Sequence, residues 1–159
     1  MNTTSSSKKP IIISLDGNIG SGKSTTWEHL KSYYLETMNR KDICFVEEPV
    51  NEWHDVVDKD GIPILTNLYK NTTKYAFRFQ IMAYISRLKL LRDAIKSGYS
   101  IIISERCVKT DKEVFCQMLY DAGDIEHDEY LIYNKWFNEF IEDVDISGLV
   151  YLELLYQYY

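Results

Sequence analysis

The sequence holds one run of residues whose types and spacing suit the binding of phosphate groups. Residues 17–24 read Gly-Asn-Ile-Gly-Ser-Gly-Lys-Ser and fit the pattern G-x-x-x-x-G-K-[ST] without a gap. Glycines let a backbone wrap around phosphates with its N–H groups pointing inward. Lys23 can reach the β- and γ-phosphates of a nucleoside triphosphate, and the Ser24 hydroxyl can ligate Mg²⁺. The residues expected to bind ATP are Gly17, Asn18, Ile19, Gly20, Ser21, Gly22, Lys23, Ser24 and Thr25.

The elements on either side of this run support that interpretation. Residues 11–15 form a short β-branched stretch typical of a buried strand, and residues 23–38 carry apolar side chains at helical spacing. The first turn of that helix adds partial positive charge next to the loop. A glycine-rich turn with an unrelated lysine is the alternative, and the strand–loop–helix context disfavours it.

Acidic residues follow two further predicted strands. Glu48 comes just after residues 43–46, and Glu105-Arg106 follows residues 101–104. Because ligands bind at the carboxyl ends of strands in open α/β sheets, both positions are candidates for a site. A solvated loop acid is the alternative for Glu48, and a surface salt bridge is the alternative for Glu105 with Arg106.

Several residues between and after these acids could hold an organic ligand. Gln80 carries amide donors and an acceptor that suit the edge of a nucleobase. Trp53 and Phe79 offer flat faces for a base, although both could simply pack in the core. Arg87 and Asp111 could form a pair that contacts a ligand or an ion pair on a helix surface.

These residues, in this order, resemble the deoxynucleoside kinase family, which includes deoxycytidine, deoxyguanosine and mitochondrial thymidine kinases. The resemblance covers residues 11–152 and departs from the family at Cys107, where serine is usual. It implies an ATP-dependent enzyme that uses Mg²⁺ and phosphorylates the 5′-hydroxyl of a deoxynucleoside in nucleotide salvage.

The resemblance also implies a role for each site residue. Glu48 and Arg106 would be catalytic, with Glu48 accepting the proton of the 5′-hydroxyl, and Ser24 and Glu105 would hold the metal. The substrate-binding residues would be Glu48, Trp53, Tyr69, Phe79, Gln80, Arg87, Arg106 and Asp111, with Tyr69 placed for the sugar 3′-hydroxyl. Arg87 and Asp111, together with Ala83, favour deoxycytidine or a purine deoxynucleoside over thymidine.

Strands alternate with helices along the chain, which indicates an α/β fold with a parallel sheet. We predict strands at 11–15, 43–46, 101–104 and 148–155, and helices at 23–38, 72–96, 109–120 and 127–143. Residues 60–63 mark a loop. The resemblance implies a three-layer P-loop NTPase-type fold flanked by helices. Residues 1–9 are expected to form a flexible tail, and residues 10–159 a single kinase domain.

The sequence departs from the family after residue 152. Family members continue with an arginine-rich lid and a fifth strand, whereas here no arginine follows Arg106. We therefore expect a C-terminally truncated domain whose fourth strand forms an open edge. Because lid closure excludes water and completes the charge clamp, we also expect impaired phosphoryl transfer.

Composition restricts the partners that we expect. The formal net charge of −6 argues against a nucleic acid polymer, which rewards a basic face. No apolar run approaches the roughly 18 residues of a membrane helix, and the N-terminus lacks a signal peptide pattern, so we expect a cytoplasmic protein. The three cysteines should be free thiols. The family resemblance also implies that the protein forms a homodimer.

Two alternatives to a deoxynucleoside kinase remain. They are a nucleotide-binding remnant without activity and a nucleoside-monophosphate kinase.

Overall fold

The computed structural model describes residues 9–18, 20–142 and 144–153, and the chain divides into two compact units. The first unit comprises Met1–Glu47, Leu91–Glu105 and Ile146–Tyr159, and the second comprises Glu48–Leu90 and Arg106–Asp145. The long helix α4 (Thr72–Lys96) has the predicted bounds and contributes residues to both units. Residues 1–8, most of the expected tail, lie outside the described residues.

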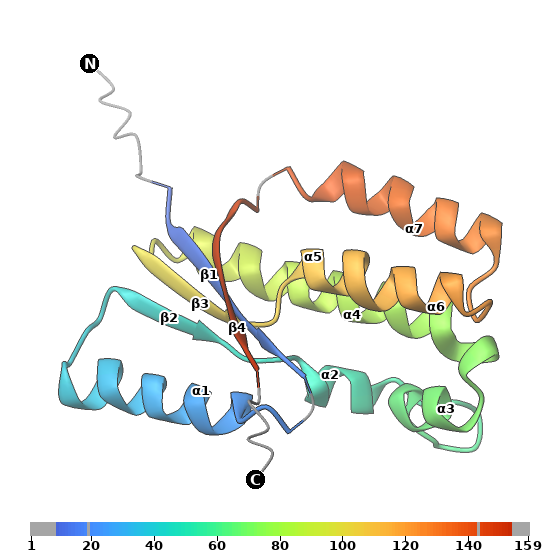
Figure 1. The fold of residues 1–159 in the computed structure, drawn as a ribbon, viewed down its shortest axis with the longest axis horizontal. Coiled ribbons are helices and arrows are strands. Elements are labelled where there is room, and N and C mark those ends of the chain that lie inside the picture. The colour runs from blue at the N-terminus through green and yellow to red at the C-terminus, as the bar shows by residue number, and fades with distance from the viewer. Residues whose placement is uncertain (1–8, 19, 143, 154–159) are drawn as a thin grey trace, which may run out of the picture. The chain divides into compact units, whose positions relative to one another are not determined.

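The first unit is built on a four-stranded sheet (Figure 1). Its strands are β1 (Ile11–Gly17), β2 (Ile43–Val46), β3 (Ile101–Glu105) and β4 (Ile146–Leu152). Their order is β2-β3-β1-β4, and all three neighbouring pairs are parallel. The predicted α/β fold with a four-stranded parallel sheet flanked by helices is confirmed.

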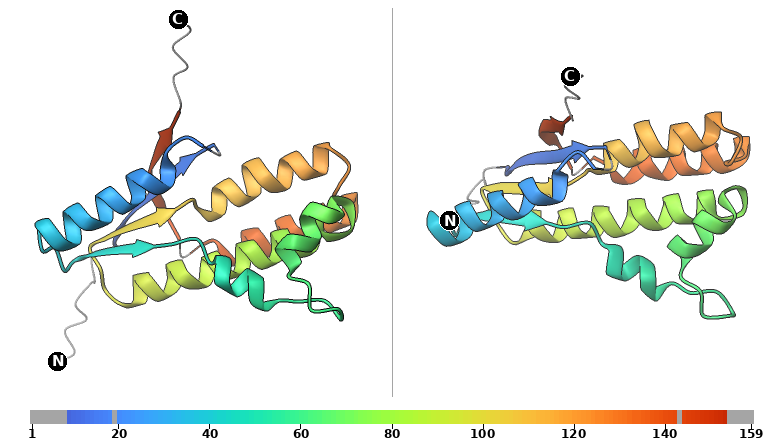
Figure 2. Two further views of the ribbon diagram at one scale, coloured as in Figure 1. Left: turned by 90° about the horizontal axis from the view of Figure 1, so that it is seen from below. Right: turned by 60° about the horizontal axis from the view of Figure 1, so that its bottom comes forward.

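Helix α1 (Lys23–Ser32) packs on this sheet through one apolar cluster. Trp27 lies in the cluster with Leu15 and Ile103, and its ring meets Phe45 edge-on with centroids 5.3 Å apart. Figure 2 shows α1 lying along the sheet. The helix continues as a π-helical turn, η1 (Tyr33–Thr37), which closes where the Met38 N–H donates to the Tyr33 carbonyl at 2.9 Å. The predicted helix at 23–38 is therefore present, with a wider last turn.

The second unit begins with two short helices that we did not predict. They are α2 (Val50–Asp55) and α3 (Ile64–Lys70), and each is preceded by a proline, Pro49 or Pro63. Proline is tolerated there because its missing N–H has no partner in a first helical turn. Between the two helices, the predicted loop is closed by an antiparallel bridge from Val57 to Pro63.

The rest of the second unit is helical (Figures 1 and 2). Val108–Thr110 (α5), Asp111–Cys116 (π-helical η2) and Gln117–Asp121 (α6) follow one another directly, and α7 spans His127–Phe140. Tyr84 of α4 packs its ring on Phe137 of α7, and its hydroxyl donates to the Phe137 carbonyl at 3.1 Å. Helix α7 ends three residues before the predicted bound at 143, which itself lies outside the described residues.

Strand β4 forms one edge of the sheet in the described part of the chain. It begins at Ile146, two residues earlier than predicted, because Ile146 pairs with Ile12 ahead of a register shift between Ile12 and Ile13. It ends at Leu152, and the expected continuation to residue 155 falls mostly outside the described residues. Its Leu149 and Tyr151 side chains are 57% and 53% exposed.

No described helix is long and apolar enough to span a bilayer.

Candidate active site

The phosphate loop of the first unit has the backbone that its glycines predict. The Ser21 N–H donates to the Asn18 carbonyl at 3.2 Å, which closes a turn ahead of α1. Gly20 and Gly22 have φ angles of +80° and +84°, a region that side-chain-bearing residues rarely adopt. Asn18, Gly20, Gly22, Ser24 and Thr25 are all exposed, and Ile19 lies outside the described residues. The loop therefore presents backbone to solvent at a helix N-terminus, as phosphate binding requires.

Gly17, the first glycine of the loop, is needed because neighbouring atoms approach it closely. A Cβ atom at this position would lie 2.5 Å from Ser21 Oγ and 2.9 Å from the Leu152 carbonyl oxygen. Gly17 and Leu152 are the last partners in the register of β1 with β4. The start of the loop and the end of β4 are thus packed against one another.

The loop lysine is held by an acid from a neighbouring strand. Lys23 Nζ forms an ion pair with Glu105 Oε1, the last residue of β3. Glu105 therefore lies beside the phosphate loop, as predicted. Glu105 and Ser24 supply hard oxygen donors, and Mg²⁺ takes one or two such ligands and completes its shell with water and phosphate oxygens. The described residues contain no cluster of three or more His, Cys, Asp or Glu side chains that would make a full metal cage.

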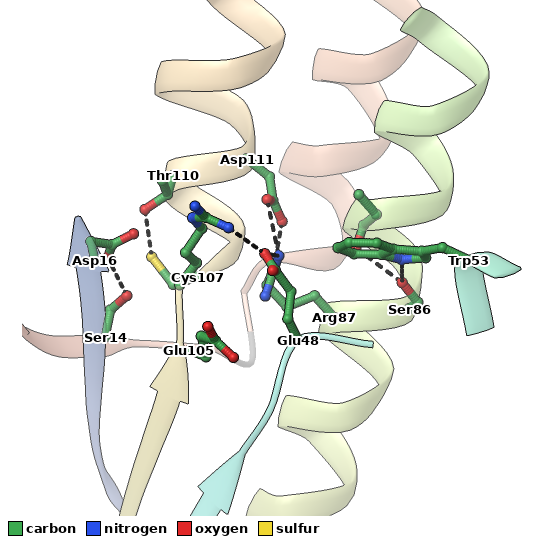
Figure 3. Close-up of polar contacts among 12 residues, drawn as sticks. Ser14, Asp16, Glu48, Trp53, Ser86, Arg87, Glu105, Cys107, Thr110 and Asp111 are labelled. Carbon is green, nitrogen blue, oxygen red and sulfur yellow. Dashed lines mark hydrogen bonds and ion pairs between the residues drawn. The ribbon is translucent and has the colours of Figure 1, made fainter. Parts of the chain in front are cut away.

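A buried polar pair that the sequence analysis missed precedes the loop. Asp16 is 3% exposed and Ser14 is fully buried, and the Ser14 hydroxyl donates to Asp16 Oδ2 at 2.5 Å (Figure 3). The signal in the sequence was an acid and a serine within a β-branched strand, where polar side chains are costly to bury. Asp16 directly precedes Gly17, so this pair anchors the strand end from which the loop leaves.

In the second unit, two arginines donate hydrogen bonds to the Glu48 carboxylate. Its Oε1 atom accepts a hydrogen bond from Arg87 Nη2 at 3.0 Å (Figure 3). The same atom accepts a second hydrogen bond from Arg106 Nη1 at 2.8 Å. Burial alone would raise the pKa of Glu48, but the charges of Arg87 and Arg106 outweigh it and lower this pKa below its ordinary value of 4.5. Glu48 is therefore an ionised carboxylate at neutral pH, and the alternative of a solvated loop acid is wrong.

Arg87 also forms an ion pair with Asp111. Arg87 Nε donates to Asp111 Oδ2 at 2.8 Å, and the two side chains are 1% and 5% exposed. The alternative of an ion pair on a helix surface is therefore wrong. Burial would lower the pKa of Arg87, but the carboxylates of Asp111 and Glu48 raise it above its ordinary value, so the guanidinium stays charged. Asp111 lies in the π-helical turn η2, a feature found frequently at functional sites.

Gln80 has a buried carbonyl oxygen that no described residue bonds. The side chain is 4% exposed, and its Oε1 atom accepts no hydrogen bond from the part of the chain that the structure describes. An unsatisfied buried acceptor costs about 1–3 kcal/mol, so such a group marks a place where a ligand or water supplies the missing donor. This is the strongest sign in the second unit of a bound molecule with an N–H group.

The aromatic candidates are packed in the core of the second unit. Trp53 and Phe79 are 5% and 8% exposed and meet edge-on, with centroids 5.1 Å apart. The Trp53 indole N–H donates to Ser86 Oγ at 3.0 Å (Figure 3). No pattern in the sequence predicted this contact. Tyr69 of α3 is 80% exposed. Contact of these three residues with a substrate stays a prediction.

Arg106 has an unusual backbone conformation, and its side chain lies over Phe115, which was not among the predicted site residues. Its φ angle is +59°, a conformation that costs a non-glycine residue about 1–2 kcal/mol and that clusters at active sites. Its guanidinium carbon lies 5.4 Å from the ring centroid of Phe115, which stands four residues after Asp111 on the same helical segment. Spacing along that helix could have suggested Phe115. Cys107, the departure from the family, is buried, and its sulfur lies 3.5 Å from Thr110 Oγ1.

The chain is similar to known proteins over most of its length. A family model described as deoxynucleoside kinase matches residues 13–158. A probable deoxycytidine kinase of fowlpox virus is 35% identical over 144 residues, which are 89% of this chain and 55% of the relative. Human deoxycytidine kinase is 29% identical over 165 residues, 89% of this chain and 60% of the relative. Mitochondrial thymidine kinase 2 of Macaca fascicularis is 25% identical over 140 residues, 88% of this chain and 48% of the relative. The chain thus spans less than two thirds of the length of each of these relatives.

Proposed function

Because the chain belongs to the deoxynucleoside kinase family, we propose that it transfers the γ-phosphate of ATP to the 5′-hydroxyl of a deoxynucleoside. The observation that carries the proposal is the ionised Glu48 carboxylate, held on one oxygen by Arg87 and Arg106. A carboxylate fixed in this way can accept the hydrogen bond of an attacking hydroxyl.

The residues of the first unit would bind the donor. Backbone N–H groups of the loop and the N-terminus of α1 would hold the phosphates, and Lys23 would exchange its bond with Glu105 for phosphate oxygens. Ser24 and Glu105 would hold Mg²⁺, which neutralises charge on the β- and γ-phosphates when it is bound.

Glu48 would orient the acceptor hydroxyl more than deprotonate it. Its lowered pKa makes it a weak base, and phosphoryl transfer is achieved largely by positioning and charge stabilisation. As the 5′-oxygen bonds to the γ-phosphorus, the bond to the β-phosphate oxygen breaks and ADP leaves. The hydroxyl proton passes to Glu48 late in that step and then to solvent, while Arg106 offsets the negative charge.

The base preference that we propose is deoxycytidine or a purine deoxynucleoside over thymidine. The Asp111 oxygens that face Arg87 act as hydrogen-bond acceptors, so Asp111 suits a base that carries an exocyclic amino group. Thymine offers no amino group, and a carbonyl oxygen facing Asp111 would be repelled. The names of the fowlpox and human relatives support this preference.

Two further proposals concern the whole protein. We propose a cytoplasmic location, which agrees with the three free cysteines, Cys44, Cys107 and Cys116. We also propose a homodimer on the basis of the family resemblance. Helix α7 exposes Leu131, Ile132 and Trp136 by 54%, 44% and 45%, which would suit such a contact. Sedimentation velocity of the purified chain tests the dimer.

An acceptor panel tests the proposed function. The full chain with ATP and Mg²⁺ is offered each of the four deoxynucleosides and the matching 5′-monophosphates, and ³¹P NMR identifies the products. We expect 5′-monophosphates from deoxycytidine or a purine deoxynucleoside. Diphosphates formed from monophosphates would instead establish a nucleoside-monophosphate kinase. The absence of product from every acceptor, with ATP still bound, would establish a nucleotide-binding protein without this activity.

A further inference from the structure

One buried guanidinium in the second unit serves two carboxylates. Arg87 donates from Nε and Nη2 to Asp111 at 2.8 and 3.4 Å, and from Nη2 to Glu48 at 3.0 Å. The Arg87 side chain is 1% exposed, so water cannot readily replace either contact. Glu48 stands just before α2, Arg87 lies within α4, and Asp111 lies in η2. Figure 3 shows Arg87 reaching both acids.

We propose that Arg87 is a positioning residue that couples recognition of the nucleobase at Asp111 to the orientation of Glu48. The inference rests on the proposed function and adds to it. A base that engages Asp111 well would hold the guanidinium, and through it the Glu48 carboxylate, in the arrangement needed for transfer. A base that does not engage Asp111 would leave Glu48 less well oriented.

The planar geometry of arginine makes such coupling effective. A guanidinium is a rigid fork, so a displacement at one hydrogen-bonded edge moves the other edge with it. A misplacement of about 1 Å in a reacting group can cost about 10²-fold in rate. Discrimination among bases would therefore extend to kcat as well as to KM.

Several charged and titratable groups lie close to the Glu48 and Asp111 carboxyl groups. Glu48 faces Arg87 of α4 and Arg106, which follows β3. Asp111 faces Arg87 and lies within electrostatic range of Glu48 and Arg106. The buried Tyr133 hydroxyl of α7, which has no hydrogen-bond partner among the described residues, is also within this range. Burial raises the pKa of Asp111 against the pull of Arg87. Loss of Arg87 would therefore raise the pKa of Asp111 further.

A titration of Glu48 tests the coupling without requiring any activity. The pKa of the ¹³C-labelled Glu48 carboxyl is measured by NMR in the wild type, Asp111→Asn, Arg87→Gln and the double variant. Arg87→Gln should raise this pKa by about 1 to 3, the range for loss of a neighbouring arginine. Asp111→Asn should lower it while Arg87 is present and have little effect in the Arg87→Gln background. Equal effects of Asp111→Asn in both backgrounds would overturn the coupling.

Kinetics with the conservative variant Arg87→Lys supply the second test. Lysine keeps the charge but cannot bond two carboxylates with a planar fork. We expect kcat for the preferred deoxynucleoside to fall about 10²-fold and kcat for the poorer ones to change little, so that the differences among bases shrink. An increase in KM alone, or an equal loss of kcat for all bases, would refute the proposal.

Arg78→Lys, at an exposed position of the same helix, is the control for folding and activity. A wild type that phosphorylates none of the four would refute the proposed function, and the titration would still decide the coupling.

Discussion

Replacing Gly17 by alanine should disturb the phosphate loop through the strand behind it. The added Cβ would lie 2.9 Å from the Leu152 carbonyl oxygen and 2.5 Å from Ser21 Oγ. The Ser21 hydroxyl can rotate away at small cost. The Leu152 oxygen belongs to the backbone at the end of β4, so it can move only if the last pair of the β1–β4 register opens.

Gly148, in the same sheet, is a matched control for the change in unfolding free energy that Gly17→Ala should cause. Overpacking of this kind costs about 1–3 kcal/mol. The φ angle of Gly17 is +159°, which a residue with a side chain rarely adopts, so no gain offsets this cost and Gly17→Ala should lose roughly 1–3 kcal/mol of unfolding free energy. Gly148→Ala, in β4, meets no atom within 4 Å and should gain about 0.5–1 kcal/mol.

Urea unfolding and ATP calorimetry of the two variants measure these effects. We expect Gly17→Ala to unfold at lower urea than Gly148→Ala and to bind ATP more weakly. Adding Ser21→Ala to Gly17→Ala should recover only part of the loss, because the Leu152 contact remains. Equal unfolding midpoints for Gly17→Ala and Gly148→Ala would refute the packing argument.

Two smaller predictions follow from buried contacts of the second unit. The pKa of folded Glu48 is below its ordinary value of 4.5, so its ionised form stabilises the fold fully above that pH and the contribution is lost as pH falls through the folded pKa. The difference in urea midpoint between the wild type and Glu48→Gln should therefore shrink between pH 6 and pH 3, and a constant difference would contradict it. Trp53→Phe removes the 3.0 Å bond to Ser86 and should cost about 1 kcal/mol in urea unfolding. A loss of similar size in Trp53→Phe whether or not Ser86 is alanine would show that this bond is not the cause.

Long periodic elements were predictable from the sequence, and short ones were not. Helix α4 has the predicted bounds because 25 residues give a clear periodicity that ends before Gly98. Helices α2 and α3 have six and seven residues, too few for a helical period to stand out. The π-helical turn at Asp111 was also missed, because its hydrogen-bond pattern leaves no mark on the spacing of apolar residues.

The residue types of the candidate site could be singled out from the sequence, but most of their contacts could not. Arg87 and Asp111 were singled out together and form a buried ion pair, while their contact with a base stays a prediction. The bond from Arg87 to Glu48 joins residues 39 positions apart and depends on how α4 packs, which no local pattern specifies. The Ser14–Asp16 pair and the approach of Phe115 to Arg106 are local, and strand and helix spacing could have suggested both, although neither was predicted.

The most direct test of the proposed function compares two adjacent glutamates. Glu48 is held by Arg87 and Arg106, whereas Glu47 is 55% exposed and pairs with Lys31. Transfer of ³²P from ATP to deoxycytidine and the other deoxynucleosides is measured for the wild type, Glu48→Gln and Glu47→Gln, with ATP affinity measured by calorimetry. We predict that Glu48→Gln loses transfer and keeps ATP binding, while Glu47→Gln keeps both. Undiminished transfer in Glu48→Gln, or loss of its ATP binding, would contradict the role assigned to Glu48.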